Sequence, residues 1–235
     1  MIYRLKLLTE KIRNFDLKVE CIENLDETID ALFEELKQTG DESTLDRLCP
    51  YFGVIWPSAL GLSHFMAEQI EHNQISRDAR ILEVGCGLAL PSLLLAKAGF
   101  KVTAIDFHPE VKVFLARNQK LNEFSHLKFD LKYIEHDWQN EELTTQKPLY
   151  DWVIGSDILY EKQHPAPVAK MLAEQVRLDG TIVLADPGRP YLQTFVDELK
   201  KYGFDVETQI LKLPDRPDPG AREIFILIGR RSPGY

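Results

Sequence analysis

The sequence predicts an α/β fold, a doubly wound and mostly parallel sheet of seven strands that ends in an antiparallel hairpin. Three observations predict it. From residue 79 onward, short apolar runs alternate with helical patterns, as in sheets whose parallel strands are joined by helices. The first of these runs leads into a glycine-containing turn at the start of a helix. The last two runs are separated by the Pro-rich residues 214–220 and no helix, so at least one of them is antiparallel to the others.

Residues 1–50 are expected to form an N-terminal extension on this domain. Residues 3–8 and 15–22 alternate in polarity as strands do, and residues 25–36 have the spacing of an acidic amphipathic helix. Residues 40–43 break that pattern. The extension either packs on the main domain, which its composition favours, or serves as a lid or substrate-recognition segment.

Residues 51–235 are expected to form the main domain. An aromatic and apolar cluster at 51–57 leads into a helix over about 57–72. Pro57 suits the first turn of that helix, because the N–H that proline lacks has no intrahelical partner there. The strands expected after it are 79–84, 101–105, 128–135, 150–155, 181–185, 204–212 and 223–229. The helices expected between them are 89–98, 108–122, 166–178 and 191–202.

Composition and charge argue against several classes of protein. A net charge of −9 argues against a nucleic-acid partner, because phosphate binding depends mainly on Lys and Arg contacts. No apolar run approaches the ~20 residues that a membrane span needs, and the first ten residues are too charged for a secretory signal. The three cysteines and six histidines lack the spacing of metal ligands or disulfides. This predicts no metal, and a reduced, cytoplasmic compartment.

Acidic residues follow the first five strands expected in the main domain. In an open α/β sheet, ligands bind beyond the carboxyl ends of the strands. A single acid at such a position can cap a helix or close a turn, but five at one edge indicate a binding site. These acids are Glu83, Asp106, Asp137, Asp157 and Asp186. The same strand ends also carry Gly85, Gly87, Trp138, Gly155, Ser156, Tyr160 and Arg189.

Two cofactors compete for the turn E-V-G-C-G. A nicotinamide dinucleotide favours G-x-G-x-x-G, but the third glycine position is Leu90, followed by Pro91. A pyrophosphate would gain nothing from Glu83 and the other carboxylates. S-adenosylmethionine has no phosphate, and carboxylates offset its sulfonium and ammonium charges. Asp106, 21 residues after Gly85, suits an acid that binds ribose hydroxyls. The charge argument therefore predicts S-adenosylmethionine.

The glycine turn, the acid at 106 and the closing hairpin resemble the class I, seven-β-strand methyltransferases. I-W-P before the first helix, H-D-W at 136–138 and S-D-I-L-Y at 156–160 resemble more closely the protein-lysine methyltransferases marked by a D-x-x-Y motif. D-P-G-R at 186–189 is similar to the branch that includes the methyltransferase of the electron transfer flavoprotein β subunit. The resemblance covers about 51–230 and implies a Rossmann-like methyltransferase fold.

The resemblance implies S-adenosylmethionine as methyl donor and S-adenosylhomocysteine as product. Gly85 and Gly87 would let the backbone approach the donor. Glu83 would orient their turn and neutralise the positive end of the donor. Asp106 would hold the ribose hydroxyls, and Asp137 would reach the adenine amino group. The implied cofactor-binding residues are Trp56, Glu83, Gly85, Gly87, Asp106, Asp137, Trp138 and Ser156.

Asp157 and Tyr160 are the residues expected to act in catalysis. Asp157 would receive the attacking amine and aim its lone pair at the methyl carbon, while Tyr160 would form a wall of the channel. A carboxylate is a weak base unless burial raises its pKa. Tyr160 and Trp56 could each be packing residues instead. Arg189 could complete a tight turn, contact an acidic stretch of a substrate protein, or brace Asp157.

The predicted function is methyl transfer to a lysine side chain of a protein. The alternatives are methylation of a small-molecule amine or of a protein arginine or histidine, and a catalytically silent donor-binding scaffold. A small-molecule enzyme needs a closed pocket that residues 1–50 cover, whereas a protein methyltransferase leaves a channel as wide as one side chain. A silent protein would have a decayed glycine turn or would lack Asp157, and this sequence keeps both.

Overall fold

The structure, a computed structural model, describes residues 3–122, 130–137, 150–214 and 222–232. Its centre is a seven-stranded sheet in the order β5-β4-β3-β6-β7-β9-β8. Its strands are β3 (Arg80–Val84), β4 (Lys101–Asp106), β5 (Leu131–Glu135), β6 (Tyr150–Ser156), β7 (Val176–Asp186), β8 (Phe204–Lys212) and β9 (Glu223–Arg231). The helices around it are α3 (Pro57–Glu71), α4 (Leu90–Lys97), α5 (Val111–Asn122), α6 (Pro165–Gln175) and α7 (Leu192–Lys201).

The direction of the strands confirms the predicted fold class. Neighbouring strands from β5 through β7 pair in parallel. β9 lies antiparallel between β7 and β8, so the closing hairpin contributes one reversed strand. The chain passes from β3 outward to β4 and later returns to the other side of β3 with β6. Strand order therefore reverses beside β3, the place where open α/β sheets bind their ligands.

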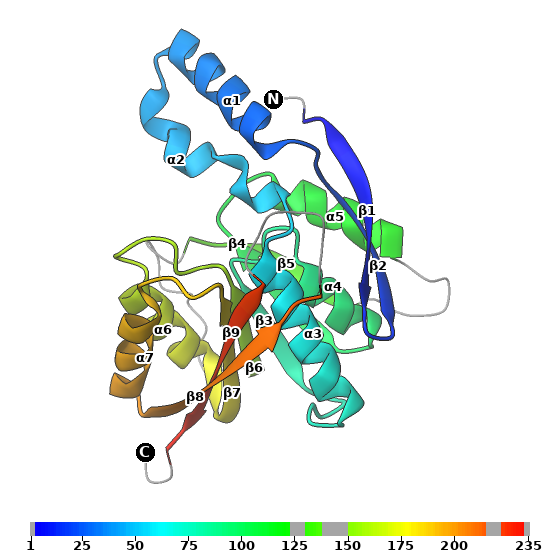
Figure 1. Cartoon of the computed structure of the whole chain (residues 1–235), viewed down its shortest axis with the longest axis vertical. Helices are drawn as coiled ribbons and strands as arrows, with labels where there is room; N and C mark the ends of the chain where they lie inside the picture. The colour runs from blue at the N-terminus through cyan, green and yellow to red at the C-terminus, as the bar shows by residue number, and fades with distance from the viewer. Residues whose placement is uncertain (1–2, 123–129, 138–149, 215–221, 233–235) are drawn as a thin grey trace.

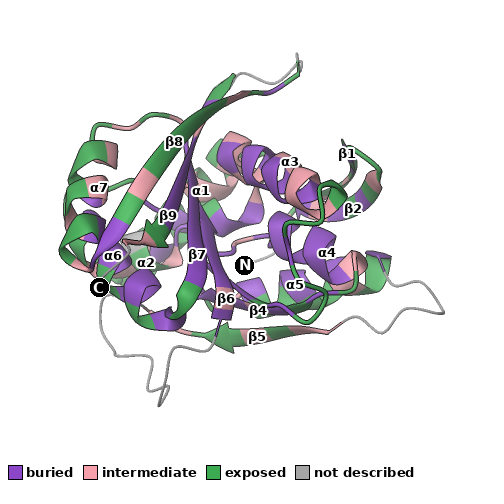
Figure 2. Cartoon of the chain, turned by 90° about the horizontal axis from the view of Figure 1, so that it is seen from below, coloured by how far each residue is buried: buried purple, intermediate pink, exposed green. Residues whose placement is uncertain are grey.

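Helices cover both faces of the sheet. α3, α4 and α5 lie against one face, and α6 and α7 against the other (Figures 1 and 2). The central strands are buried along most of their length, whereas the edge strands β5 and β8 are largely exposed (Figure 2). Near-continuous apolar runs are expected in strands that are covered on both faces, and burial of this apolar surface is the main stabilising term.

Two expected helix boundaries in the main domain are wrong by three residues, and each has a local cause. The helix expected over 166–178 ends at Gln175, because Val176 takes an extended conformation and pairs with Tyr150 of β6. The helix expected from residue 108 begins at Val111. Before it, the side chain of Asp106 accepts a hydrogen bond from the His108 N–H, so residues 106–110 form a turn. The first residues of the strand expected at 128–135, and most of the turn at 214–220, lie outside the described residues.

The N-terminal residues form a two-stranded antiparallel hairpin of β1 (Leu5–Ile12) and β2 (Phe15–Ile22). The first strand extends further than the predicted 3–8. Inward-facing residues such as Leu17 and Val19 are fully buried in the same hydrophobic cluster as the residues of α3 and α4. At the tip of the hairpin, Arg13 makes ion pairs with two glutamates of α3. The hairpin is therefore packed on the main domain.

Two asparagines of α5 fix the outer edge of β2. The amide of Asn122 accepts a hydrogen bond from the Lys18 N–H at 2.9 Å and donates one to the Lys18 carbonyl at 2.7 Å. Asn118 makes the same pair of bonds to Glu20, at 2.7 and 3.2 Å. Both asparagines are buried. Their side chains thus satisfy backbone groups of β2 that would otherwise lack partners.

The helix α1 (Leu25–Thr39) follows the hairpin and has well-formed ends. Asn24 caps its first turn by accepting a hydrogen bond from the Glu27 N–H at 3.2 Å, and Gly40 ends it at a φ of +77°. α1 and α2 (Leu45–Leu48) project beyond the sheet (Figure 1). The turn η2 (Pro50–Gly53) then returns the chain to the main domain. None of the described helices combines the length and apolar character that a membrane crossing requires.

Candidate active site

A cavity of about 430 Å³ lies beyond the carboxyl ends of β3, β4 and β6. Its size is within the range of ~300–1,000 Å³ that is usual for small-molecule sites. The walls come from the glycine turn after β3, the turn after β4, the loop after β6, and the segment between α2 and α3. Arg189, which follows β7, also contributes to the wall. This is the position that strand order predicts for a ligand.

The glycine turn has a backbone that requires glycine. Gly85 and Gly87 have φ values of +63° and +51°, in the left-handed region. A Cβ atom at Gly87 would lie 3.1 Å from the carbonyl oxygen of Phe52, a backbone atom that cannot rotate away. The turn therefore packs directly against η2, and both segments line the cavity.

Glu83 lies behind the glycine turn and is not among the described residues that line the cavity. Its Oε2 accepts hydrogen bonds from the N–H and the hydroxyl of Ser92 in α4, while its Oε1 has no hydrogen-bond partner among the described residues. Burial raises the pKa of this carboxyl to about 8. Glu83 thus holds the start of α4 against the end of β3, and its role toward a donor stays a prediction.

Asp106 joins the turns that follow β3 and β4. Its Oδ2 accepts a hydrogen bond from the Gly87 N–H at 2.9 Å, and its Oδ1 accepts one from the His108 N–H at 3.0 Å. Burial raises the pKa of Asp106, although both hydrogen bonds oppose that shift. His108 packs on Phe52, and its Nε2 lies 3.2 Å from the Leu48 carbonyl oxygen. This carbonyl belongs to the N-terminal extension, so the extension supports one wall of the cavity.

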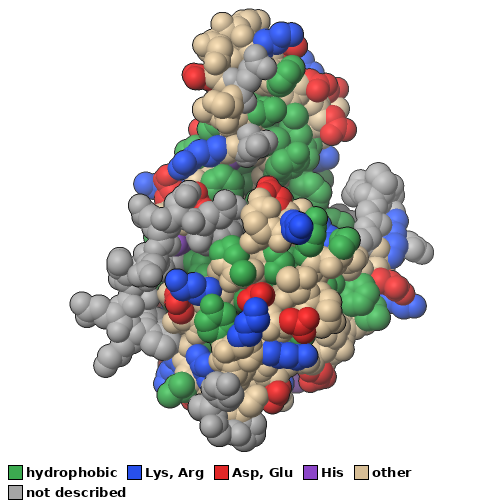
Figure 3. All heavy atoms as spheres, turned by 90° about the vertical axis from the view of Figure 1, so that its left-hand side faces the viewer, with side chains coloured by type: hydrophobic (Ala, Val, Ile, Leu, Met, Phe, Trp, Pro, Cys, Tyr) green, Lys and Arg blue, Asp and Glu red, His purple; other side chains and the backbone are tan. Residues whose placement is uncertain are grey.

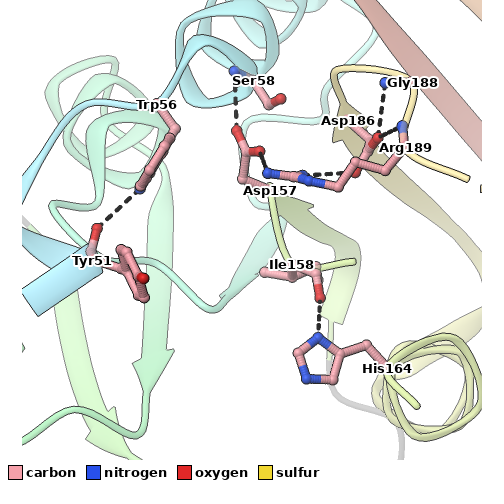
Figure 4. Close-up of polar contacts among 9 residues, drawn as sticks. All are labelled: Tyr51, Trp56, Ser58, Asp157, Ile158, His164, Asp186, Gly188 and Arg189. Carbon is pink, nitrogen blue, oxygen red and sulfur yellow. Dashed lines mark hydrogen bonds and ion pairs between the residues drawn. The ribbon is translucent and has the colours of Figure 1, made fainter. Parts of the chain in front are cut away.

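Asp157 lies on the opposite wall, in a strained backbone conformation. Its φ is +60°, which is uncommon for a residue other than glycine and frequent at functional sites. The side chain is only 8% exposed, and its Oδ1 lies 2.5 Å from Nη2 of Arg189. Oδ2 accepts a weaker hydrogen bond, 3.3 Å long, from the Ser58 N–H in the first turn of α3 (Figure 4). Burial raises the pKa of Asp157, and the Arg189 guanidinium opposes that rise.

Arg189 connects Asp157 to a second buried carboxylate. Its Nη1 lies 3.0 Å from Oδ2 of Asp186, which is fully buried. Oδ1 of Asp186 accepts hydrogen bonds from the N–H groups of Gly188 and Arg189 at 2.8 and 2.7 Å. Of the three roles considered for Arg189, the structure contains the bracing contact with Asp157, and the D-P-G-R segment is also a tight turn (Figure 4).

Tyr160 and Trp56 are the aromatic residues predicted at the site, and both line the cavity. Tyr160 is 43% exposed and contacts the ring of buried His164, whose Nδ1 lies 3.1 Å from the Ile158 carbonyl oxygen. Burial raises the pKa of the Tyr160 phenol to about 12, so it stays protonated. Trp56 is half-buried, and its indole N–H donates to the Tyr51 carbonyl at 2.9 Å.

The structure brings most of the predicted site residues to one cavity. Glu83 lies behind the wall, the half-buried Asp137 is not among the described lining residues, and Trp138 is outside the described residues. The residues that line the cavity as predicted are Trp56, Gly85, Gly87, Asp106, Ser156, Asp157 and Tyr160. Sequence reasoning missed Cys49, Tyr51, Phe52 and His108 as wall residues. The dense aromatic cluster at 51–57 was the available signal for two of them.

Charged groups of both signs are mixed on the face of the molecule that Figure 3 shows. On the face in Figure 3, Lys and Arg side chains are interspersed with Asp and Glu, and hydrophobic side chains gather on the projecting N-terminal segment. Within the described ranges, no three His, Cys, Asp or Glu side chains converge as the ligands of a metal ion would.

Comparison with known proteins gives matches to methyltransferases. The pattern that defines the lysine methyltransferase family matches residues 46–201. The calmodulin-lysine N-methyltransferase of Arabidopsis thaliana is 26% identical over 153 residues, which cover 63% of this chain and 49% of that protein. The electron transfer flavoprotein β subunit lysine methyltransferase of Xenopus laevis is 27% identical over 143 residues, covering 60% and 53%. The chain thus spans about half the length of these curated relatives.

The fold is also similar to that of solved methyltransferase structures. Magnesium protoporphyrin IX methyltransferase from Synechocystis PCC 6803, solved with bound SAH, superposes with a TM-score of 0.58 at 17% identity. The superposition covers 87% of this chain and 99% of that one. It confirms the predicted Rossmann-like methyltransferase fold, and the sequence matches confirm the resemblance on which the predicted function rests.

Proposed function

The chain belongs to the lysine methyltransferase family, and from this membership we propose that it transfers a methyl group from S-adenosylmethionine to a lysine side chain of a protein. One observation carries the proposal. A single cavity joins the glycine turn and Asp106, which suit a methyl donor, to Asp157 and Tyr160, which suit an amine acceptor.

The residues around the glycine turn fit S-adenosylmethionine. A Cβ at Gly87 would lie 3.1 Å from the Phe52 carbonyl oxygen, so the glycine turn packs closely on η2, and both segments line a cavity with apolar and polar walls. In the proposed complex, Gly85 and Gly87 approach the methionine part, and Asp106 accepts hydrogen bonds from the ribose with its remaining lone pairs. Trp56 and Ser156 line the same site. Asp137 remains the proposed contact of the adenine amino group, and Trp138 the proposed apolar surface beside the donor. When bound, the donor supplies a methyl group that its sulfonium already activates.

Asp157 is proposed to receive the acceptor nitrogen. A free lysine amine has a pKa of about 10.4, so it enters mainly as an ammonium and must lose a proton to solvent before it can attack. The Asp157 carboxylate attracts the ammonium and then accepts a hydrogen bond from the neutral amine, which orients the nitrogen lone pair. Tyr160 forms the adjacent wall. Alignment of this kind can contribute ~7–11 kcal/mol to rate enhancement.

The accessibility of the cavity supports a protein substrate over a small molecule. Tyr51 and Tyr160 both line it and are 52% and 43% exposed, so its walls reach the molecular surface. A side chain that extends from a protein needs such an opening, whereas a small-molecule amine favours an enclosed pocket. The intact glycine turn and the buried Asp157 also argue against a silent scaffold. All three cysteines are buried, and their lack of disulfide spacing fits the proposed cytoplasmic location.

Two measurements test the proposal. In titration calorimetry, S-adenosylmethionine and S-adenosylhomocysteine should bind and NAD should not; the reverse preference would remove the donor assignment.

The second experiment identifies the acceptor. The chain is incubated with methyl-tritiated donor and either cell lysate, calmodulin or electron transfer flavoprotein, and the labelled proteins are hydrolysed. Label in methyllysine supports the proposal, and label confined to small molecules supports the small-molecule alternative. Asp157→Ala should keep donor binding and lose the methyllysine label.

A further inference from the structure

Asp157 depends on one side chain for its orientation. Two polar contacts of its side chain differ in strength, because the Arg189 contact is 2.5 Å long and the Ser58 N–H contact is 3.3 Å long. In the Arg189 contact both partners carry a full charge, whereas the Ser58 N–H is neutral and lies farther away. The Arg189 guanidinium therefore determines where the Asp157 carboxylate points (Figure 4).

Arg189 is itself fixed by the turn that carries it. Asp186 binds both the guanidinium and two backbone N–H groups of the turn, and it is fully buried. Gly188 has a φ of +95°, and a Cβ atom there would lie 2.8 Å from the ring of Phe225. The backbone of this turn therefore has little conformational freedom. From it, Nη1 of Arg189 contacts Asp186 and Nη2 contacts Asp157, so the guanidinium bridges the two carboxylates.

Arg189 also dominates the electrostatics around Asp157. Among the described residues that line the cavity, it is the only lysine or arginine. The other groups that act on Asp157 are the Asp186 carboxylate, which lies beyond the guanidinium, and the neutral Ser58 N–H from the first turn of α3. Tyr160 and Glu161, on the loop of Asp157, line the same cavity. Asp106 and His108 line the same cavity.

We propose that Arg189 is a positioning residue for methyl transfer, which holds the Asp157 carboxylate oriented and ionised to receive the acceptor amine. The catalytic consequence rests on the proposed function, whereas the effect of Arg189 on Asp157 does not. Without Arg189, the buried Asp157 would hold a proton to higher pH, since an opposite charge within a few ångströms lowers a carboxyl pKa by about 1–3 units. A protonated Asp157 is a weaker hydrogen-bond acceptor for the neutral amine and loses its attraction for the ammonium.

The first test measures the ionisation of Asp157 and needs no acceptor. The full chain is labelled with ¹³C at the aspartate carboxyl carbons, and the Asp157 signal is assigned by its loss in Asp157→Asn. Arg189→Gln should raise the measured Asp157 pKa by about 1–3 units, and Arg189→Lys should raise it less, because a positive charge remains. Arg177→Gln is the matched control, since Arg177 makes a 2.8 Å ion pair with Asp151 and does not line the cavity. An unchanged Asp157 pKa in Arg189→Gln would overturn the proposal.

The second test measures methyl transfer from tritiated donor to polylysine as a function of pH. Arg189→Gln should reduce the rate at neutral pH at least tenfold, and the deficit should shrink as the pH rises and Asp157 ionises. Arg189→Lys should restore most of the pH profile but keep a lower maximal rate, because one ammonium cannot bridge two carboxylates as the guanidinium does. A deficit that is the same at every pH would contradict control of ionisation. If wild-type protein fails to methylate polylysine, the protein-lysine proposal is weakened, while the pKa comparison still decides the role of Arg189.

Discussion

Gly87→Ala tests whether the glycine turn holds the methyl donor. Gly87 has a φ of +51°, and an added Cβ would lie 3.1 Å from the Phe52 carbonyl oxygen and 3.5 Å from the Phe52 Cα. A left-handed conformation costs a residue with a Cβ ~1–2 kcal/mol. The contact adds an overpacking cost of ~1–3 kcal/mol. The free energy of unfolding should therefore fall by about 2–5 kcal/mol.

Gly40→Ala separates the two costs. Gly40 also has a left-handed backbone, with a φ of +77°, but nothing lies within 4 Å of a Cβ built there. It ends α1 and is not among the described residues of the cavity wall. This control variant should lose only the conformational cost of ~1–2 kcal/mol, and it should bind donor as the wild type does.

Urea unfolding and titration calorimetry with S-adenosylhomocysteine measure both quantities for each variant. The displacement of η2 and of the turn should weaken binding by Gly87→Ala at least tenfold, which corresponds to about 1.4 kcal/mol. If Gly87→Ala binds S-adenosylhomocysteine as tightly as Gly40→Ala, the turn is not where the donor lies, and the donor site must be sought elsewhere in the cavity.

Two further predictions concern stability. The pKa of Glu83 is raised from 4.5 to about 8, so between these values the folded state holds a proton that the unfolded state releases, and stability should fall as pH rises through that window. Glu83→Gln keeps an oxygen acceptor for Ser92 and cannot ionise. Its free energy of unfolding relative to wild type should therefore increase with pH by up to about 1.4 kcal/mol per pH unit. A difference in free energy that stays constant across pH in urea unfolding would contradict the raised pKa. Asn122→Ala removes three hydrogen bonds, to the N–H and carbonyl of Lys18 and to the Asn118 carbonyl. It should lower the free energy of unfolding by about 2–4 kcal/mol and speed hydrogen exchange at the Lys18 amide, while the donor affinity stays the same. Lys120 is an exposed neighbour on α5, and the control variant Lys120→Ala should change neither the free energy of unfolding nor the exchange rate at Lys18.

The sequence predicted those parts of the fold that depend on local patterns. The spacing of apolar residues located the seven strands of the large sheet, and the missing helix before the last strand predicted the antiparallel hairpin. Strand order was not predictable in the same way, because the insertion of β9 between β7 and β8 depends on pairing between distant residues. For the same reason the helix ending at Gln175 was predicted too long. The pairing of Val176 with Tyr150 overrides a helical pattern that continues past it.

The candidate site was predictable where chemistry follows strand ends. Asp106 ends β4 and Asp157 directly follows β6, and both lie in the cavity wall. The sequence could not show that Asp157 is held by Arg189, because 32 residues separate the two and their contact depends on the parallel pairing of β6 with β7. Nor could it show that Cys49 belongs to the wall, since Cys49 follows α2, a short helix that contacts α1.

The contact between α5 and β2 has a consequence for any shortened form of this chain. Residues four apart on a helix rise by about 6 Å, and residues two apart on a strand by about 6.7 Å, so the two repeats nearly coincide. Asn118 and Asn122 therefore offer an extended chain two peptide-like partners in register, and Lys18 and Glu20 occupy them. Deleting residues 1–22 would leave these buried amides exposed as a template for any other extended segment. A chain shortened in this way should then bind extended segments of other proteins along α5. Where no other protein is present, it should bind extended segments of further copies of itself.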